Sequence, residues 1–219
     1  MRMLDISRPL RSGEDIVCEI PADLPVYEGL ACEEYRHAFR SHTGCYFETS
    51  AHLFRGGPMT SDVPPETLFL PAVIARLAPQ RRDGIGAEEL SSAVGERNLR
   101  GHALIVNTGG RDGRYFEREC AQWLSGRGVA LLSASLDQYD TGFDHPTGIF
   151  TDLFRAGIPI LAGIENLDAI GHDWVFLVAL PLLISRVCTA PCRAVVMDGE
   201  RWEVQLLVKL LRPDLALEE

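Results

Sequence analysis

The sequence predicts a single domain of mixed α/β structure that contains more sheet than helix. Two observations carry this prediction. Short apolar runs of strand type alternate with amphipathic segments of helical spacing, and neither a regular repeat nor a linker divides the chain. At 219 residues the chain is long enough to bury a substantial core. We therefore predict one domain over residues 1–219.

The N-terminal part of the chain predicts a strand followed by an arm. Residues 3–10 (MLDISRPL) form the predicted strand, which ends at Pro9. The arm covers about residues 11–30, where Gly13 and two prolines interrupt any regular element. Proline-rich arms of this kind often reach across to a neighbouring subunit.

Hydrophobic periodicity predicts the remaining elements. Residues 69–77 (FLPAVIARL) and 102–107 (HALIVN) are apolar runs typical of buried strands. Further strands are predicted at 129–135, 158–161 and 174–183, with a closing pair at 194–197 and 202–208. Helical spacing predicts helices at 86–94, 116–124 and 150–156.

Residues 41–54 (SHTGCYFETSAHLF) carry the densest group of titratable side chains. From His42 to His52 the even positions read His, Gly, Tyr, Glu, Ser and His, whereas the odd positions are small or apolar. This period of two is typical of a strand with one polar face. A straight strand would place His42 and His52 roughly 33 Å apart. Both can serve one site only if the segment bends, and we expect bends at Gly44 and at Thr49–Ser50; the alternative is an amphipathic strand with its polar face in water.

Composition favours a soluble, cytoplasmic protein and says little about a small-molecule substrate. The net charge of −10 disfavours nucleic acid and anionic membranes as partners, because both require a basic surface. The N-terminus has no signal-peptide pattern, and no apolar run reaches the roughly 18 residues of a membrane span. The six cysteines are scattered along the chain, as is typical of cytosolic thiols. Cys45 is one of the odd-numbered positions that form the apolar face of residues 42–52, so we expect it to be a buried core thiol rather than a nucleophile.

The order of residues between His42 and His52 (HTGCYFETSAH) resembles the pattern H-x-G-T-H-x-D-x-P-x-H of a cyclase family. That family includes bacterial kynurenine formamidase, isatin hydrolase and polyketide-cluster cyclases. Segments along nearly the whole chain are similar to other landmarks of the family: 5–10 (DISRPL), 103–109 (ALIVNTG), 121–128 (AQWLSGRG), 156–160 (AGIPI), 165–167 (ENL) and 179–182 (ALPL). The resemblance implies a swivelling β/β/α fold with a mixed sheet or barrel core and flanking helices. It also implies a homodimer or homotetramer.

The departures from the pattern fall on the family's metal site. The resemblance implies that the first two histidines and the aspartate bind metal, and that the last histidine is a general acid/base. It also implies a later histidine and glutamate that complete the site. In this chain Tyr46 replaces the second histidine, Glu48 replaces the aspartate, and Phe150 and Ala162 stand at the two later positions.

These replacements predict that no catalytic metal is bound. A phenol must lose a proton to bind a metal, and Phe and Ala offer no donor atom. Zinc or manganese would bind only if other residues compensated, and His145 and Glu165 are the candidates nearest in sequence.

The preferred function is therefore a metal-independent cyclase or dehydratase that acts on a carbonyl-rich small molecule, such as a polyketide or another secondary metabolite. Ring closure needs a general base and a donor that stabilises an enolate. We assign His52 as the acid or base and Glu48 as the group that orients it. Tyr46 donates a hydrogen bond to the developing oxyanion, and His42 assists or binds substrate.

Four further residues are predicted to bind substrate. Ser50 lies on the polar parity, and Phe150 would make the pocket more apolar, which suits a flat ligand. Asp137 and Tyr139 follow the strand predicted at 129–135, at the carboxyl end where α/β proteins often place ligand groups.

Two alternative functions remain open. One is a metal-dependent amide or lactam hydrolase of the kynurenine formamidase type with a remodelled site, which requires an activated water. Metal analysis and an assay of N-formylkynurenine cleavage distinguish it from the preferred function. The other is a non-catalytic binding protein on this fold, for which His52→Ala would leave the biological output unchanged.

Overall fold

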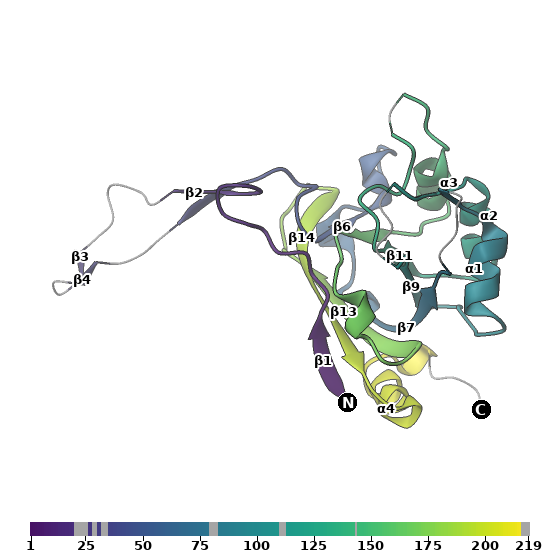
Figure 1. The fold of residues 1–219 in the computed structure, drawn as a ribbon. Coiled ribbons are helices and arrows are strands. Elements are labelled where there is room, and N and C mark those ends of the chain that lie inside the picture. The colour runs from purple at the N-terminus through teal and green to yellow at the C-terminus, as the bar shows by residue number, and fades with distance from the viewer. Residues whose placement is uncertain are drawn as a thin grey trace.

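The computed structural model of the chain describes residues 1–19, 26–27, 30–31, 35–78, 83–109, 113–142 and 144–215. In this part of the chain seven strands close into a barrel (Figure 1). Their order is β14–β13–β7–β9–β11–β12–β6, and β6 pairs back with β14. The bounds are β6 (Tyr46–Glu48), β7 (Phe69–Arg76), β9 (Ala103–Asn107), β11 (Leu131–Ala134), β12 (Ile160–Ala162), β13 (Trp174–Pro181) and β14 (Thr189–Asp198).

The strand directions divide the barrel into two parts. Strands β7, β9, β11 and β12 run parallel to one another, whereas every pairing that involves β13, β14 or β6 is antiparallel. Strand β1 (Arg2–Asp5) adds to β14 outside the ring. The predicted mixed α/β fold with a barrel core is confirmed.

Helices cover the outer surface of the barrel. Helices α1 (Ala87–Val94), α2 (Glu119–Gly126) and α3 (Ile149–Arg155) share one apolar cluster with the outward side chains of β7, β9, β11 and β12. Helix α4 (Arg201–Leu211) packs Val204 and Val208 against Phe176 of β13. All seven barrel strands contribute to a separate apolar cluster, which is the barrel interior.

The smaller elements lie around this core. Strands β2 (Val17–Glu19) and β5 (Arg36–Ala38) form an antiparallel pair, as do β3 (Val26–Tyr27) and β4 (Leu30–Ala31), and both pairs stand away from the barrel (Figure 1). Strands β8 (Gly84–Ile85) and β10 (Tyr115–Phe116) pair in parallel. Parts of the predicted arm at 11–30, namely residues 20–25 and 28–29, lie outside the described residues. Short 3-10 turns cover 50–52, 60–62, 65–68, 167–169 and 213–215.

The strand predicted at 202–208 is wrong, because this segment belongs to helix α4. The Trp and Val residues of the segment favour a strand by propensity. However, Val204 and Val208 lie four residues apart and both are buried, which matches the helical period. Glu200 and Glu203 form a reciprocal capping box at the start of the helix. Tertiary packing and capping therefore outweigh β propensity here.

Asp198 fastens the end of β14 to the start of the chain. Its carboxylate is 2% exposed and accepts hydrogen bonds from the backbone N–H groups of Gly171 and His172, from Nδ1 of His172 and from Nε of Arg2. Burial would raise the pKa of Asp198, but these donors hold it at about 2.

We expect Asp198→Asn to lower the free energy of unfolding by about 2 kcal/mol at neutral pH, because each pKa unit corresponds to about 1.4 kcal/mol. The pKa of the folded state lies below that of the unfolded chain. The stabilisation is therefore present above about pH 4 and is lost as the pH falls towards about 2. Urea unfolding of both proteins across this pH range checks the expectation.

Asp152→Asn is the matched control. Asp152 forms a surface ion pair with Arg118, at 2.7 Å, and pairs of that kind contribute about 1 kcal/mol or less. Equal losses of stability at the two positions, or a loss at Asp198 that does not change with pH, would contradict this account.

Candidate functional site

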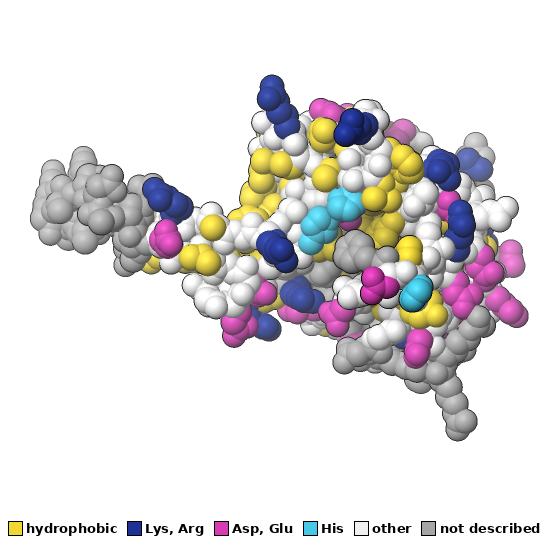
Figure 2. Space-filling model, turned by 90° about the horizontal axis from the view of Figure 1, so that it is seen from above, with side chains coloured by type: hydrophobic (Ala, Val, Ile, Leu, Met, Phe, Trp, Pro, Cys, Tyr) yellow, Lys and Arg dark blue, Asp and Glu magenta, His cyan; other side chains and the backbone are white. Residues whose placement is uncertain are grey.

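Two imidazoles meet one buried carboxylate on the outside of the barrel. Nε2 of His42 lies 2.8 Å from Oε1 of Glu48, and Nδ1 of His52 lies 2.9 Å from the same oxygen. The Glu48 side chain is only 4% exposed, whereas the two histidines reach solvent. Figure 2 shows histidine side chains on the surface beside hydrophobic ones. The structure therefore brings together His42, Glu48 and His52. Tyr46, the fourth residue predicted to be catalytic, lies beside His42.

The chain bends at both predicted places. Gly44 has a φ of +65°, and a Cβ there would lie 2.7 Å from the Leu10 side chain, so the turn before β6 requires glycine. After β6 the chain leaves the sheet at Thr49 and enters the 3-10 turn Ser50–His52. These two turns return both histidines to Glu48, and the alternative of one straight amphipathic strand is wrong.

Strand β6 separates the site from the barrel interior. Tyr46 packs with the outer apolar cluster, whereas Cys45 and Phe47 belong to the interior cluster. The prediction that Cys45 is a buried core thiol is confirmed, because it is 4% exposed. The period of two therefore holds across the short strand, and it directs Glu48 outwards.

Two residues of β14 and the loop before it complete the surroundings of Glu48, and sequence reasoning missed both. Thr189 pairs with Glu48 across the β14–β6 ladder, and its buried hydroxyl donates to Oε1 at 3.2 Å. The thiol of Cys188 lies 3.9 Å from Nδ1 of His52. Only the closure of the barrel brings these residues to the site, and no local pattern in the sequence encodes that pairing.

The local electrostatics set the protonation of two groups. The hydrogen bond to Glu48 raises the pKa of His42, and the Ser41 hydroxyl lies 3.0 Å from the other ring nitrogen of His42. Burial, with the nearby charge of Glu48, raises the pKa of Tyr46 to about 12. The Tyr46 phenol is therefore a protonated donor at neutral pH, and its ring centroid lies 5.1 Å from that of His42.

An aromatic row extends from His52 along α3. The ring of His52 lies 6.5 Å from that of Phe154, and Phe154 lies 6.0 Å from Phe150. Phe150 stacks on Tyr139, with centroids 6.3 Å apart. Tyr139 itself is buried in the core, and its hydroxyl donates to the carbonyl of Leu161. Phe150 thus borders the site through Phe154, while Tyr139 lies behind it.

The other predicted residues lie elsewhere or at the margin. Ser50 opens the 3-10 turn, and Asp137 lines a different cavity, where it pairs with Arg8 at 3.2 Å. His145 and Glu165, the two candidates for compensation, do not belong to the cluster around Glu48. The substrate contacts of Ser50, Phe150, Asp137 and Tyr139 stay predictions.

The donor set around Glu48 fits a divalent metal ion. Donor atoms of His42, Glu48 and His52 all lie within 4.8 Å of one another. Around tetrahedral zinc, with ligands at about 2.0–2.2 Å, donor atoms lie about 3.4 Å apart, so moderate shifts of these side chains would complete the arrangement. Two imidazoles and one carboxylate form a ligand set that zinc accepts in catalytic sites, where a fourth position stays open. Sequence reasoning missed this set because it assigned His52 to proton transfer only, and the predicted absence of a metal stays a prediction.

The chain is similar in sequence to known proteins over most of its length. Residues 4–140 match the family described as "Putative cyclase". The chain is 25% identical to the kynurenine formamidase of Bacillus cytotoxicus over 210 residues, which cover 88% of this chain and 96% of that protein. It is 24% identical to the kynurenine formamidase of Bacillus anthracis over 212 residues, covering 89% and 97%.

Two solved structures share the fold. Isatin hydrolase A from Labrenzia aggregata superposes with a TM-score of 0.73 at 18% identity, covering 91% of this chain and 94% of that one. A potential metal-dependent hydrolase with cyclase activity superposes with a TM-score of 0.69 at 20% identity, covering 91% and 98%. Among the described residues, no helix has the length and apolar character that crossing a membrane requires.

Proposed function

Since the chain belongs to the cyclase family and is an enzyme of the cyclase or hydrolase class, we propose that it is a metal-assisted hydrolase of an amide or lactam bond next to an aromatic ring. The observation that carries the proposal is the convergence of His42, Glu48 and His52 on one point. The names of its relatives, kynurenine formamidase and isatin hydrolase, support the choice of bond.

The metal would be held by His42, Glu48 and His52, and when bound it would polarise the carbonyl and lower the pKa of a water. Thr189 donates a hydrogen bond to Glu48 and orients it. The Ser41 hydroxyl lies 3.0 Å from Nδ1 of His42, the ring nitrogen that does not contact Glu48. Each of these contacts limits the motion of a candidate ligand.

The remaining side chains act on the substrate. The protonated phenol of Tyr46 donates a hydrogen bond to the carbonyl oxygen as negative charge develops there. The buried ring of Phe154 excludes water from one side of the site, and the partly buried Phe150 beside it offers an apolar surface for an aromatic ring.

The test is hydrolysis of N-formylkynurenine and of isatin by the protein before chelation, after chelation, and after zinc or manganese is restored. We expect chelation to lower kcat/KM by at least about 100-fold and one of the metals to restore it. An unchanged rate after verified removal of metal would contradict the proposal.

A second candidate function is the metal-independent cyclase or dehydratase acting on a polyketide or another carbonyl-rich molecule. One observation favours it: the His52–Glu48 contact is a complete pairing of a general base with the carboxylate that orients it. Ring closure of a poly-β-ketone substrate should then be insensitive to chelation. His52→Ala should lower its rate by about 10²–10⁴-fold, and an unaltered rate in that variant would exclude this candidate.

A further inference from the structure

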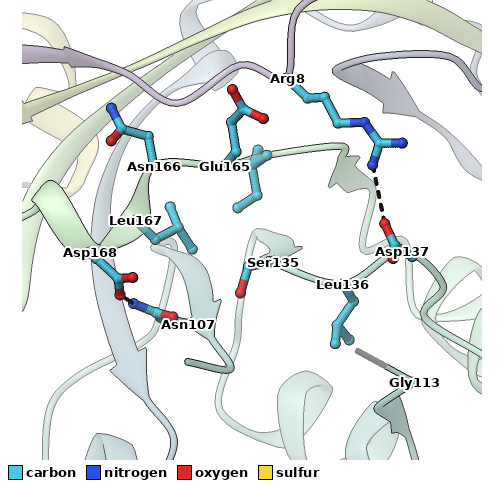
Figure 3. A pocket seen from close by; sticks show the side chains of 11 residues that line it. Arg8, Asn107, Gly113, Ser135, Leu136, Asp137, Glu165, Asn166, Leu167 and Asp168 are labelled. Carbon is cyan, nitrogen blue, oxygen red and sulfur yellow. Dashed lines mark hydrogen bonds and ion pairs between the residues drawn. The ribbon is translucent and has the colours of Figure 1, made fainter. Parts of the chain in front are cut away.

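A separate cavity of about 280 Å³ opens at the carboxyl ends of β9, β11 and β12 (Figure 3). Its lining comes from the end of β9, from the segments that follow β11 and β12, and from Arg8 and Gly113. None of its lining residues belongs to the cluster around Glu48. The carboxyl ends of parallel strands are the usual place for a ligand site in α/β folds.

The cavity combines an apolar base with charged groups. Leu136, Ile164 and Leu167 are each at most 7% exposed and give the apolar part of the lining. Figure 3 shows Arg8 and Asp168 on opposite sides, with the Glu165 side chain between them. The lining therefore offers one cation, carboxylates and an apolar surface within one small volume.

The guanidinium of Arg8 and the carboxylates of the cavity are both available to pair with a ligand. The partner of Arg8 is Asp137, at 3.2 Å, and the side chains are 47% and 70% exposed. Exposed ion pairs are weak, so a ligand carboxylate can replace Asp137. Glu165 makes no ion pair or side-chain hydrogen bond with any described residue, and Asp168 accepts one hydrogen bond, from the amide of Asn107.

We propose that this cavity binds a free α-amino acid with an apolar side chain. Its carboxylate pairs with Arg8, and its ammonium group, carried on the adjacent carbon, pairs with Glu165, which lies nearer to Arg8 than Asp168 does (Figure 3). Its side chain lies on the buried leucine and isoleucine surface. The volume is just below the roughly 300–1,000 Å³ of pockets that hold drug-sized ligands, which is room enough for one amino acid.

The test uses L-leucine and three fragments of it. 4-Methylpentanoate lacks the ammonium group, 3-methylbutylamine lacks the carboxylate, and glycine lacks the side chain. We expect saturable binding of L-leucine in an isothermal titration and in a ¹H–¹⁵N NMR titration, with each fragment at least about tenfold weaker. Resonances of residues 135–137 and 164–168 should shift.

Two variants test which residues bind the carboxylate and the ammonium group of the ligand. Arg8→Ala and Glu165→Gln should each weaken L-leucine binding by at least about tenfold. The backbone of Arg8 is held by Cys45 and Gly163, so the fold tolerates loss of its side chain. Asp137→Asn is the matched control: it removes the competing carboxylate, and binding should be as tight as in the unmodified chain or tighter.

Three results would overturn the proposal: no saturable binding at millimolar L-leucine, equal binding of L-leucine and its fragments, or undiminished binding by both Arg8→Ala and Glu165→Gln. Metal binding at His42, Glu48 and His52 is measured on the same samples. Because the two sites share no residue, failure of one inference is distinguishable from failure of the other.

Discussion

Replacing Glu48 by glutamine is expected to lower kcat/KM by about 10³-fold while the protein stays folded. Glutamine has nearly the same shape, so the strand pairing of β6 with β12 and β14 should persist. The change removes the negative charge that binds both imidazoles and the proposed metal. Losing a ligand charge together with the orientation of two neighbouring groups combines two effects of about 10–100-fold each or more.

Thr189→Val is the matched control for Glu48→Gln. It removes one hydrogen bond to Oε1 and keeps the shape of a β-branched side chain in β14. We expect a decrease of about 10-fold in kcat/KM, as for other outer-shell partners. Steady-state kinetics with N-formylkynurenine measure both variants. A Glu48→Gln enzyme within tenfold of the unmodified enzyme would show that the buried carboxylate is not central to the reaction.

Replacing Gly163 by alanine is expected to destabilise the fold by about 4 kcal/mol or more. Gly163 has a φ of +67°, and a Cβ there would lie 1.8 Å from the carbonyl oxygen of Gly44. The neighbouring atoms are backbone and cannot rotate away. The Gly163 carbonyl also accepts a hydrogen bond from the N–H of Arg8, which holds it in place. The clash therefore forces the turn that carries His42 away from β12.

Gly157→Ala separates the steric clash from the backbone conformation. Gly157 has a φ of +76°, but nothing lies within 4 Å of a Cβ built there. Its replacement should cost only about 1–2 kcal/mol, the usual cost of a left-handed alanine. Urea unfolding followed by circular dichroism compares the two variants, and equal losses of stability would contradict the close approach of Gly163 to Gly44.

Much of the barrel could be predicted because its strands are locally apolar. The runs at 69–77 and 174–183 correspond closely to β7 and β13, since strands covered on both faces need continuous hydrophobic residues. The alternation of polar and apolar residues over 45–48 was equally predictive, because it placed the side chains of Glu48 and Cys45 on opposite sides of the chain at β6. The segment at 202–208 misled because its local composition favours a strand while its burial follows the helical period.

The site was only partly predictable, for a different physical reason. The pattern of titratable residues and the two expected bends indicated that His42, Glu48 and His52 meet. The pairing of β14 with β6, by contrast, joins residues about 140 positions apart, as in the hydrogen bond of Thr189 to Glu48. No periodicity within either strand specifies that register. Thr189 and Cys188 therefore entered the site only with the three-dimensional structure.

The metal content of the purified chain after dialysis against zinc tests the central claim most directly. The account predicts one ion per chain for the unmodified protein, and almost none for the variant in which His42, Glu48 and His52 are all replaced by alanine. Circular dichroism confirms that the variant is folded. An unmodified chain that retains no ion, or a folded variant that retains a full equivalent, would contradict it.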